Sequence, residues 1–468
     1  MKASPVSDFT SGNSTKQILG FFWPLLLTSM LQQLYNFVDT LIVGKGLGDN
    51  ALAAVGNMGS LFFLVIGFSL GLSNGFGVLI AQSFGAKDYD RLRRNLAATI
   101  QLAAGIAVFL TVTSILFLPF ALRLLNTDEV IMSDSLLYGY IVLGGLSTSI
   151  LYNVSSCILR SLGDSKTPLK AIIASSILNL GLDSFFIFIL KTGVEGAAIA
   201  TVLSQVISST ICIRQLRKIE FIRLKKSDFK NQFSLYLELL KNGLPMAFMN
   251  SLTAIGCMVV QSFVNDYGVT YTSAYSVCGK YNNLFMNPAF TAGNAMSAFT
   301  GQNHGAGNYV RIREGLRVCL RIAFIAYLIL GSVMVLFPRT LATFLLEGEQ
   351  PISLAVQYFP ITGVSLIAVD FLFVYRSGVQ GMGHPFVPML SGIMEMVMRI
   401  LVIVLFMGQI GFLATAFAET AAWISALLIN VIAFYRILLP RLSREDPERR
   451  FGKHPGLRSL KRAVDPAR

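Results

Sequence analysis

Residues 81–93 read AQSFGAKDYDRLR, and residues 301–313 read GQNHGAGNYVRIR. The two stretches lie 220 positions apart and share six residues at the same spacing. The same offset pairs Gly163 with Gly383 and Pro168 with Pro388. The chain is therefore an internal duplication, with a little over 200 residues in each half. The six shared pairs are Gln82/Gln302, Gly85/Gly305, Ala86/Ala306, Tyr89/Tyr309, Arg91/Arg311 and Arg93/Arg313.

Long apolar runs fill both halves. The 468 residues are 54% hydrophobic and only 13% charged, whereas soluble domains carry about 25% charged residues. Runs near 20 residues suit a hydrocarbon core roughly 30 Å thick. We predict an all-α membrane protein whose twelve transmembrane helices form two six-helix lobes. The twelve runs are 18–43, 54–80, 96–118, 136–157, 169–190, 194–213, 240–264, 270–299, 319–337, 355–375, 387–408 and 411–437.

Lys and Arg residues gather in the loops that follow even-numbered helices. The loop after the second helix carries Lys87, Arg91 and Arg94, and we assign Arg376 to the loop after the tenth. Loops after odd-numbered helices hold at most one basic residue each, such as Lys45. The positive-inside rule then places both termini in the cytoplasm. The net charge of +13 favours contact with anionic lipid and not with nucleic acid.

These features divide the chain into five segments. We predict a cytoplasmic tail at 1–17, an N-lobe at 18–213, a charged linker at 214–239, a C-lobe at 240–437 and a basic cytoplasmic tail at 438–468. Pro24 and Pro245 occupy corresponding places early in the first and seventh helices. A proline bends a helix because it removes a backbone hydrogen bond, and Pro24 is therefore either a gate or a static kink.

Polar side chains form two stripes within the first half. Asp39 follows Asn36, Tyr35 and Gln32 at helical spacing, and Asp183 follows Asn179 and Ser176 in the same way. Thr201 and Ser204 lie on the next helix. Carboxyl groups inside a bilayer are costly unless they are paired, hydrated or neutralised. Such a set can share a proton or supply oxygen ligands to Na⁺, or it can be a buried structural network.

The second half carries different charges. The 220 offset puts Val259 opposite Asp39 and Ile403 opposite Asp183. Asp370, Glu395 and Arg399 fall within its apolar runs. Glu395 and Arg399 are spaced i, i+4 and can pair, which indicates either mutual neutralisation or a part in binding and lobe movement.

The cysteines and histidines form no pattern typical of a catalytic or metal site. The five cysteines have no metal-ligand spacing, and the three histidines, His304, His384 and His454, fall in predicted loops or the tail. We find no catalytic triad, zinc motif or phosphate-binding loop. We therefore expect a protein that is not an enzyme, that needs no cofactor and that does not use ATP directly.

The chain resembles multidrug and toxic compound extrusion (MATE) transporters over nearly its whole length. The resemblance is carried by Pro24 and Asp39, by QSFGAKDYDRLRR at 82–94, by LRSLGDSKTP at 159–168 and by VQGMGHPFVP at 379–388. The 159–168 and 379–388 turns resemble a branch of bacterial multidrug exporters. The family implies a V-shaped pair of lobes, alternating access, and export of organic cations from a bacterial cell in exchange for H⁺ or Na⁺.

The resemblance also implies roles for individual residues. The cation site would comprise Asp39, Asn179, Asp183 and Thr201, which could hold Na⁺ if the coupling ion is a metal. The bending proline would be Pro24, and Asp370 matches a family Asp on the tenth helix, although its usual Glu partner on helix seven is absent near Thr253. One chain holds both lobes, so a monomer suffices. The substrate cavity would be lined by Gln32, Tyr35, Asn36, Tyr138, Asn153 and Ser176.

Two other functions remain open at this point. Flippases for lipid-linked precursors share the wider fold, but a cavity for pyrophosphate should be basic, and Arg399 is the clearest intramembrane cation. A narrow metabolite exporter would have the same architecture. A sensor or scaffold would usually carry an additional soluble domain.

Overall fold

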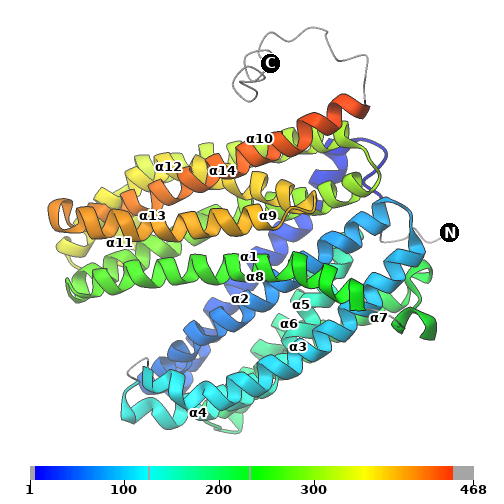
Figure 1. Cartoon of the computed structure of the whole chain (residues 1–468). Helices are drawn as coiled ribbons and strands as arrows, with labels where there is room; N and C mark the ends of the chain where they lie inside the picture. The colour runs from blue at the N-terminus through cyan, green and yellow to red at the C-terminus, as the bar shows by residue number, and fades with distance from the viewer. Residues whose placement is uncertain (1–5, 125–126, 231–232, 446–468) are drawn as a thin grey trace.

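Figure 1 shows the computed structural model, which describes residues 6–124, 127–230 and 233–445. The part of the chain so described is helical nearly throughout. The helices of the first half are α1 (Ser14–Leu47), α2 (Asp49–Gly85), α3 (Tyr89–Leu124), α4 (Glu129–Gly144), α5 (Leu146–Ser161), α6 (Lys166–Ser184) and α7 (Val194–Arg217). Those of the second half are α8 (Phe233–Asn265), α9 (Val269–Gly305), α10 (Tyr309–Leu336), α11 (Pro338–Leu345), α12 (Glu349–Gly381), α13 (Phe386–Ile410) and α14 (Leu413–Glu445).

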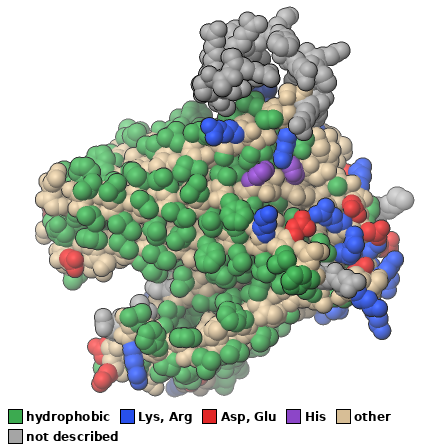
Figure 2. Space-filling model, in the orientation of Figure 1, with side chains coloured by type: hydrophobic (Ala, Val, Ile, Leu, Met, Phe, Trp, Pro, Cys, Tyr) green, Lys and Arg blue, Asp and Glu red, His purple; other side chains and the backbone are tan. Residues whose placement is uncertain are grey.

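The helices form two groups that meet at one end of the molecule. We call α2–α7 with the later part of α1 the N-lobe, and α9–α14 with the later part of α8 the C-lobe. In Figure 1 the N-lobe lies below the C-lobe, and the two converge near the N-terminus. Lys and Arg side chains gather at this closed end, and the surface is hollowed between the lobes at the other, open end (Figure 2). The faces between the two ends are mostly apolar, as a surface in contact with lipid requires.

Most helices are long and apolar enough to cross a membrane. Ten pass by length and composition, and α4 with α5 forms an eleventh span that is bent by 46°. The sequence predicted one continuous helix at 136–157, whereas the helix breaks at Gly145, between α4 and α5. The helix α9 spans 37 residues but is too polar to pass the same test, since it contains Asn282, Asn287 and Lys280. The predicted all-helical, multi-span membrane fold is confirmed, with ten or eleven spans by this test in the part of the chain that the structure describes. The remaining predicted span, 270–299, lies within α9.

The first helix of each half passes from one lobe to the other. Near the closed end, Ile18 and Phe21 of α1 belong to the apolar core of the C-lobe. Further along the same helix, Val43 belongs to a core of the N-lobe. The helix α8 does the reverse, since Leu239 packs among N-lobe residues and Val264 among C-lobe residues. Pro24 and Pro245 thus lie close to where each helix changes lobe.

Candidate functional site

The polar stripes of the first half meet inside the N-lobe. Asp39 lies on α1 and Asp183 on α6, and their carboxyl groups are close enough to interact directly. Asp183 is fully buried. Each of the two carboxyl groups has a buried oxygen with no hydrogen-bond donor among the described residues. Two adjacent carboxylates repel each other in a medium that screens poorly, so this pair is a place for a proton or another small cation.

An asparagine and a threonine lie next to the carboxyl pair. With its amide oriented to satisfy both ends, Asn179 Nδ2 donates to Asp183 Oδ2 at 2.6 Å. Asn179 Oδ1 then accepts from the backbone N–H of Thr201, on α7, at 3.3 Å. The Thr201 hydroxyl donates to the Ala197 carbonyl at 3.0 Å. In this orientation Asn179 offers the carboxylate a donor and not a metal-ligating oxygen.

Two tyrosines border the same site. Tyr35, one turn before Asp39 on α1, and Tyr138 of α4 both lie near Thr201 and the carboxyl pair. Tyr138 is only 6% exposed and packs near Phe62. The structure therefore brings six of the residues singled out from the sequence into one cluster on four helices: Tyr35, Asp39, Tyr138, Asn179, Asp183 and Thr201.

The other predicted cavity residues lie outside this cluster. Gln32 and Asn36 are on an exposed face of α1, whereas Asn153 and Ser176 are half-buried on α5 and α6. Within the described ranges, none of these four side chains is hydrogen-bonded to the carboxyl pair. Their place as a cavity lining stays a prediction.

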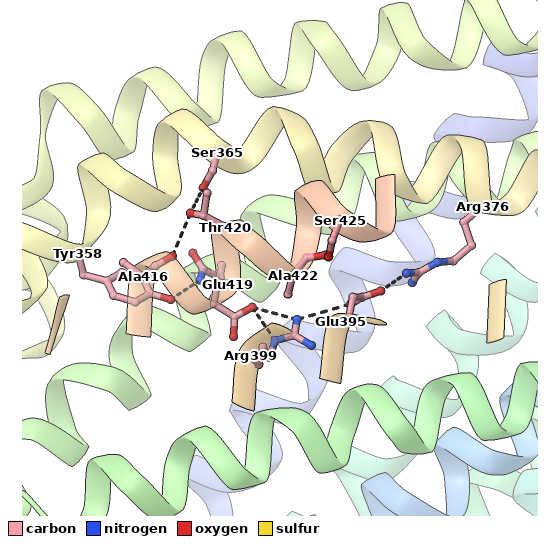
Figure 3. A network of polar contacts seen from close by, with 11 residues as sticks. Tyr358, Ser365, Arg376, Glu395, Arg399, Ala416, Glu419, Thr420, Ala422 and Ser425 are labelled. Carbon is pink, nitrogen blue, oxygen red and sulfur yellow. Dashed lines mark hydrogen bonds and ion pairs between the residues drawn. The ribbon is translucent and has the colours of Figure 1, made fainter. Parts of the chain in front are cut away.

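A second polar network crosses the C-lobe (Figure 3). Glu395 of α13 forms ion pairs with Arg376 of α12 and with Arg399, whose Nη2 lies 3.5 Å from Glu395 Oε2. Arg399 Nε and Nη2 also donate to Glu419 of α14, at 3.1 and 2.9 Å. All four side chains are buried, and their formal charges cancel. We call these four residues the charge quartet.

The quartet confirms one prediction from the sequence and corrects another. The i, i+4 pairing of Glu395 with Arg399 is confirmed. The assignment of Arg376 to a loop is wrong, because this residue lies inside α12 and is 7% exposed. His304 likewise lies in the last turn of α9 and not in a loop, whereas His454 lies outside the described residues. Sequence reasoning also missed Glu419, which falls within the twelfth apolar run.

Asp370 is isolated from the quartet and from the carboxyl pair. It is fully buried on α12, and neither carboxyl oxygen has a hydrogen-bond partner among the described residues. A buried carboxyl without a partner is stable only in its neutral form.

The proline inside α1, Pro24, lies between the carboxyl pair and the closed end. Pro24 is half-buried, and its carbonyl accepts a hydrogen bond from the Thr28 hydroxyl at 2.7 Å. Because proline has no N–H, the Gly20 carbonyl loses its usual helical donor at this point. The helix is therefore weakest where it passes from the C-lobe core to the N-lobe.

The helical fold and the internal duplication are those of a family of membrane transporters. The sequence profile of the MatE family matches residues 24–185 and 245–405. The chain belongs to this MATE family, whose members are transporters and not enzymes, and it is a multi-pass membrane protein.

Individual relatives agree with this assignment. The chain is 31% identical over 73% of its length to "Probable multidrug resistance protein YoeA" of Bacillus subtilis, and the match covers 76% of that protein. It is 32% identical to "Probable multidrug resistance protein YpnP" of the same organism, over 65% of this chain and 68% of the relative. A solved structure described as the outward-facing conformation of a multidrug resistance MATE family transporter superposes with a TM-score of 0.86, at 22% identity, over 95% of this chain and 99% of that one.

Proposed function

We propose that this transporter is a secondary active antiporter that exports organic cations in exchange for an inward flow of protons, by alternating access. The observation that carries the proposal is the contact between the Asp39 and Asp183 carboxyl groups within the N-lobe. Protonation of the pair removes its negative charge, and deprotonation restores it. A site that changes charge in this way can bind a coupling ion on one side of a membrane and release it on the other.

The donor set favours a proton over Na⁺ as the coupling ion. A Na⁺ site needs several oxygens that converge on one point. When the Asn179 amide is oriented to satisfy its hydrogen bonds, its nitrogen faces Asp183 and its oxygen is turned to Thr201; a Na⁺ ion would require the opposite orientation. A proton needs the two carboxyl groups alone.

We place the closed end in the cytoplasm of a bacterial cell and the open end outside, with the chain in the plasma membrane as a monomer. The Lys and Arg side chains at the closed end support this orientation. The multidrug resistance relatives support drug-like substrates. The aromatic rings of Tyr35 and Tyr138 beside two acids suit an organic cation, because ring faces attract positive charge. In this orientation, protons reach the pair from outside, the drug leaves, the lobes rock, and the protons are released inside.

Uptake of a fluorescent organic cation into inverted membrane vesicles tests the proposal. A pH gradient alone should drive uptake, and Asp39→Asn should abolish it. A strict requirement for a Na⁺ gradient would replace the proton by a metal ion. Absence of uptake under both gradients would contradict the proposal and favour a narrow metabolite exporter or a flippase. The charge-balanced quartet speaks against a flippase, whose pyrophosphate substrate needs net positive charge.

A further inference from the structure

Two short segments of identical sequence precede the first helices of the two halves. Both read Ser-Asp-Phe, at 7–9 and at 227–229, with the same 220 offset as the rest of the duplication. Each lies against the opposite lobe. The Phe9 ring is 5.8 Å from the ring of Phe299 in the C-lobe, and Asp228 Oδ2 is 3.8 Å from Arg93 Nε in the N-lobe.

A pair of glutamines joins the lobes at the closed end with the same symmetry. Gln82 Nε2 of α2 donates to the Gly381 carbonyl at 3.0 Å. Gln302 Nε2 of α9 donates to the Ser161 carbonyl at 2.9 Å. The two acceptors are themselves 220 positions apart. Each glutamine therefore holds the last residue of a helix in the other lobe.

The helices that carry these glutamines are in backbone contact. A Cβ atom added to Gly85 would lie 1.8 Å from the Gln302 carbonyl oxygen, and one added to Gly305 would lie 1.9 Å from that of Gln82. Any larger residue would push α2 and α9 apart. The shared glycines of the duplicated motif thus allow the closed end to shut.

The two halves differ in how the segment before their first helix is held. We call the segment before α1 the strap (residues 6–12). Gln302 Oε1 accepts from the Phe9 N–H at 2.8 Å, and Asn303 Nδ2 donates to the Phe9 carbonyl at 3.1 Å. The Arg311 guanidinium donates to the carbonyls of Phe9 at 2.9 Å and Gly12 at 2.8 Å. The Phe9 side chain is 1% exposed, whereas its counterpart Phe229 is 38% exposed. Only the first of the two segments is inserted into the protein.

The strap also touches the N-lobe. The Ser7 N–H donates to the Leu162 carbonyl at 3.2 Å, and Val6 packs against an N-lobe core. Gly163 has a φ of +84°, and a Cβ atom there would lie 2.3 Å from the Ser7 carbonyl oxygen. Residues 9–12 are thus bound to the C-lobe and Val6 to the N-lobe, and Ser7 is bonded to both, through Leu162 and Gln302, across the surface where the lobes meet.

We propose that the strap is a latch on the closed end. It stabilises the state in which this end is shut, and its contacts with one lobe must break before the end can open. The inference rests on alternating access, which is part of the proposed function. The physical argument is that Phe9 and Arg311 fix the strap on the C-lobe, while the bonds of Ser7 to Leu162 and of Gln302 to Ser161 form only when the lobes are together. A contact made in one state alone shifts the equilibrium towards that state.

The separation of the lobes at the closed end can be measured directly. Spin labels at Arg94→Cys of α3 and Arg317→Cys of α10, both exposed, report the distance across this end by double electron–electron resonance in lipid nanodiscs. Cys257, the exposed one of the five free cysteines, is changed to Ser. Phe9→Ala should raise the population with the longer distance ~10-fold, since a buried Phe is costly to truncate. The matched variant Phe229→Ala should leave the distribution unchanged.

A second pair of variants keeps the test decisive if Phe9→Ala does not fold. Arg311→Gln removes the donors to the strap, whereas its counterpart Arg91 pairs with Glu238 at an exposed site. Arg311→Gln should raise the long-distance population about threefold, because several charge-assisted hydrogen bonds are lost, and Arg91→Gln should not. Equal distributions within each pair of variants would overturn the latch.

These measurements need neither substrate nor an ion gradient, so they are independent of the uptake assay. A chain that exports the dye but shows no change in these variants would lack the latch. A chain that shows the change but exports no dye would keep the latch and lose the proposed function.

Discussion

The two lobes hold their buried charges in opposite ways. In the N-lobe, Asp39 and Asp183 place two groups of like charge against each other. In the C-lobe, the quartet joins two arginines to two glutamates, and its charges cancel. A like-charged pair is stable only with a bound cation, so its state depends on its surroundings. A balanced network is stable as it is, and removing one member is costly. We infer that the carboxyl pair of the N-lobe is a switch, because its charge depends on a bound cation. The quartet of the C-lobe is a brace, because it stabilises the lobe without one.

The strongest test of this difference is Asp39→Asn. The amide has the shape of the carboxyl group but cannot exchange a proton, so gradient-driven uptake should fall to the level of vesicles without the protein. Expression and unfolding temperature should stay near those of the unchanged chain. Normal uptake by this variant would remove the switch from the N-lobe.

Glu395→Gln should have the largest effect on stability. It leaves Arg376 and Arg399 buried with one carboxylate between them, and breaking a buried pair costs about 3–5 kcal/mol. Thermal unfolding in detergent should show a large drop. The control is Glu349→Gln, which breaks an exposed pair with Arg339 and should change unfolding little. Equal unfolding curves for the two variants would show that the quartet is no brace.

Pro24→Ala should slow transport several-fold and leave cation binding intact. Alanine restores the helical hydrogen bond to the Gly20 carbonyl and stiffens α1 between the carboxyl pair and the closed end. Pro245→Ala stiffens α8, which carries Val259 at the position that corresponds to Asp39. Because α8 has no carboxyl group at that position, this variant should slow transport less. Turnover in reconstituted liposomes compares the two. A larger effect of Pro245→Ala would argue that α1 is not the moving helix.

Asp370→Asn should have the smallest effect. The carboxyl group has no partner within the part of the chain described, so a neutral amide of equal size should leave uptake nearly unchanged. The measurement is the same gradient-driven assay as for Asp39→Asn. A loss of uptake as complete as in that variant would give the C-lobe a coupling residue of its own.

The sequence predicts the architecture well because both of its signals are local. The apolar runs mark the spans, and the 220 offset marks the duplication. The break between α4 and α5 was missed because Gly144 and Gly145 lie inside an uninterrupted apolar run. The polarity of α9 is tolerated because this helix is largely covered by its neighbours, with Asn282 and Asn287 both buried.

In the candidate site, too, only the features with a local sequence signal were predicted. Asp39 and Tyr35, or Asp183 and Asn179, share a face of one helix, and helical spacing reveals them. The quartet pairs residues on three different helices, and no spacing along the chain shows that. Arg376 follows directly after a run that ends at 375, so its position alone resembled a loop. The strap was missed because its only signal is the short Ser-Asp-Phe repeat at 7–9 and 227–229, and three shared residues do not show which partners they contact.

The crossing of α1 and α8 has a consequence for the origin of the chain. Each half has the start of its first helix embedded in the core of the other half. A single ancestral repeat that folded in this way could not have completed its own core. It would have had to exchange helix ends with a second copy, as domain-swapped dimers do. In such an origin, gene fusion would have made this exchange internal, and the two halves could then diverge but not separate.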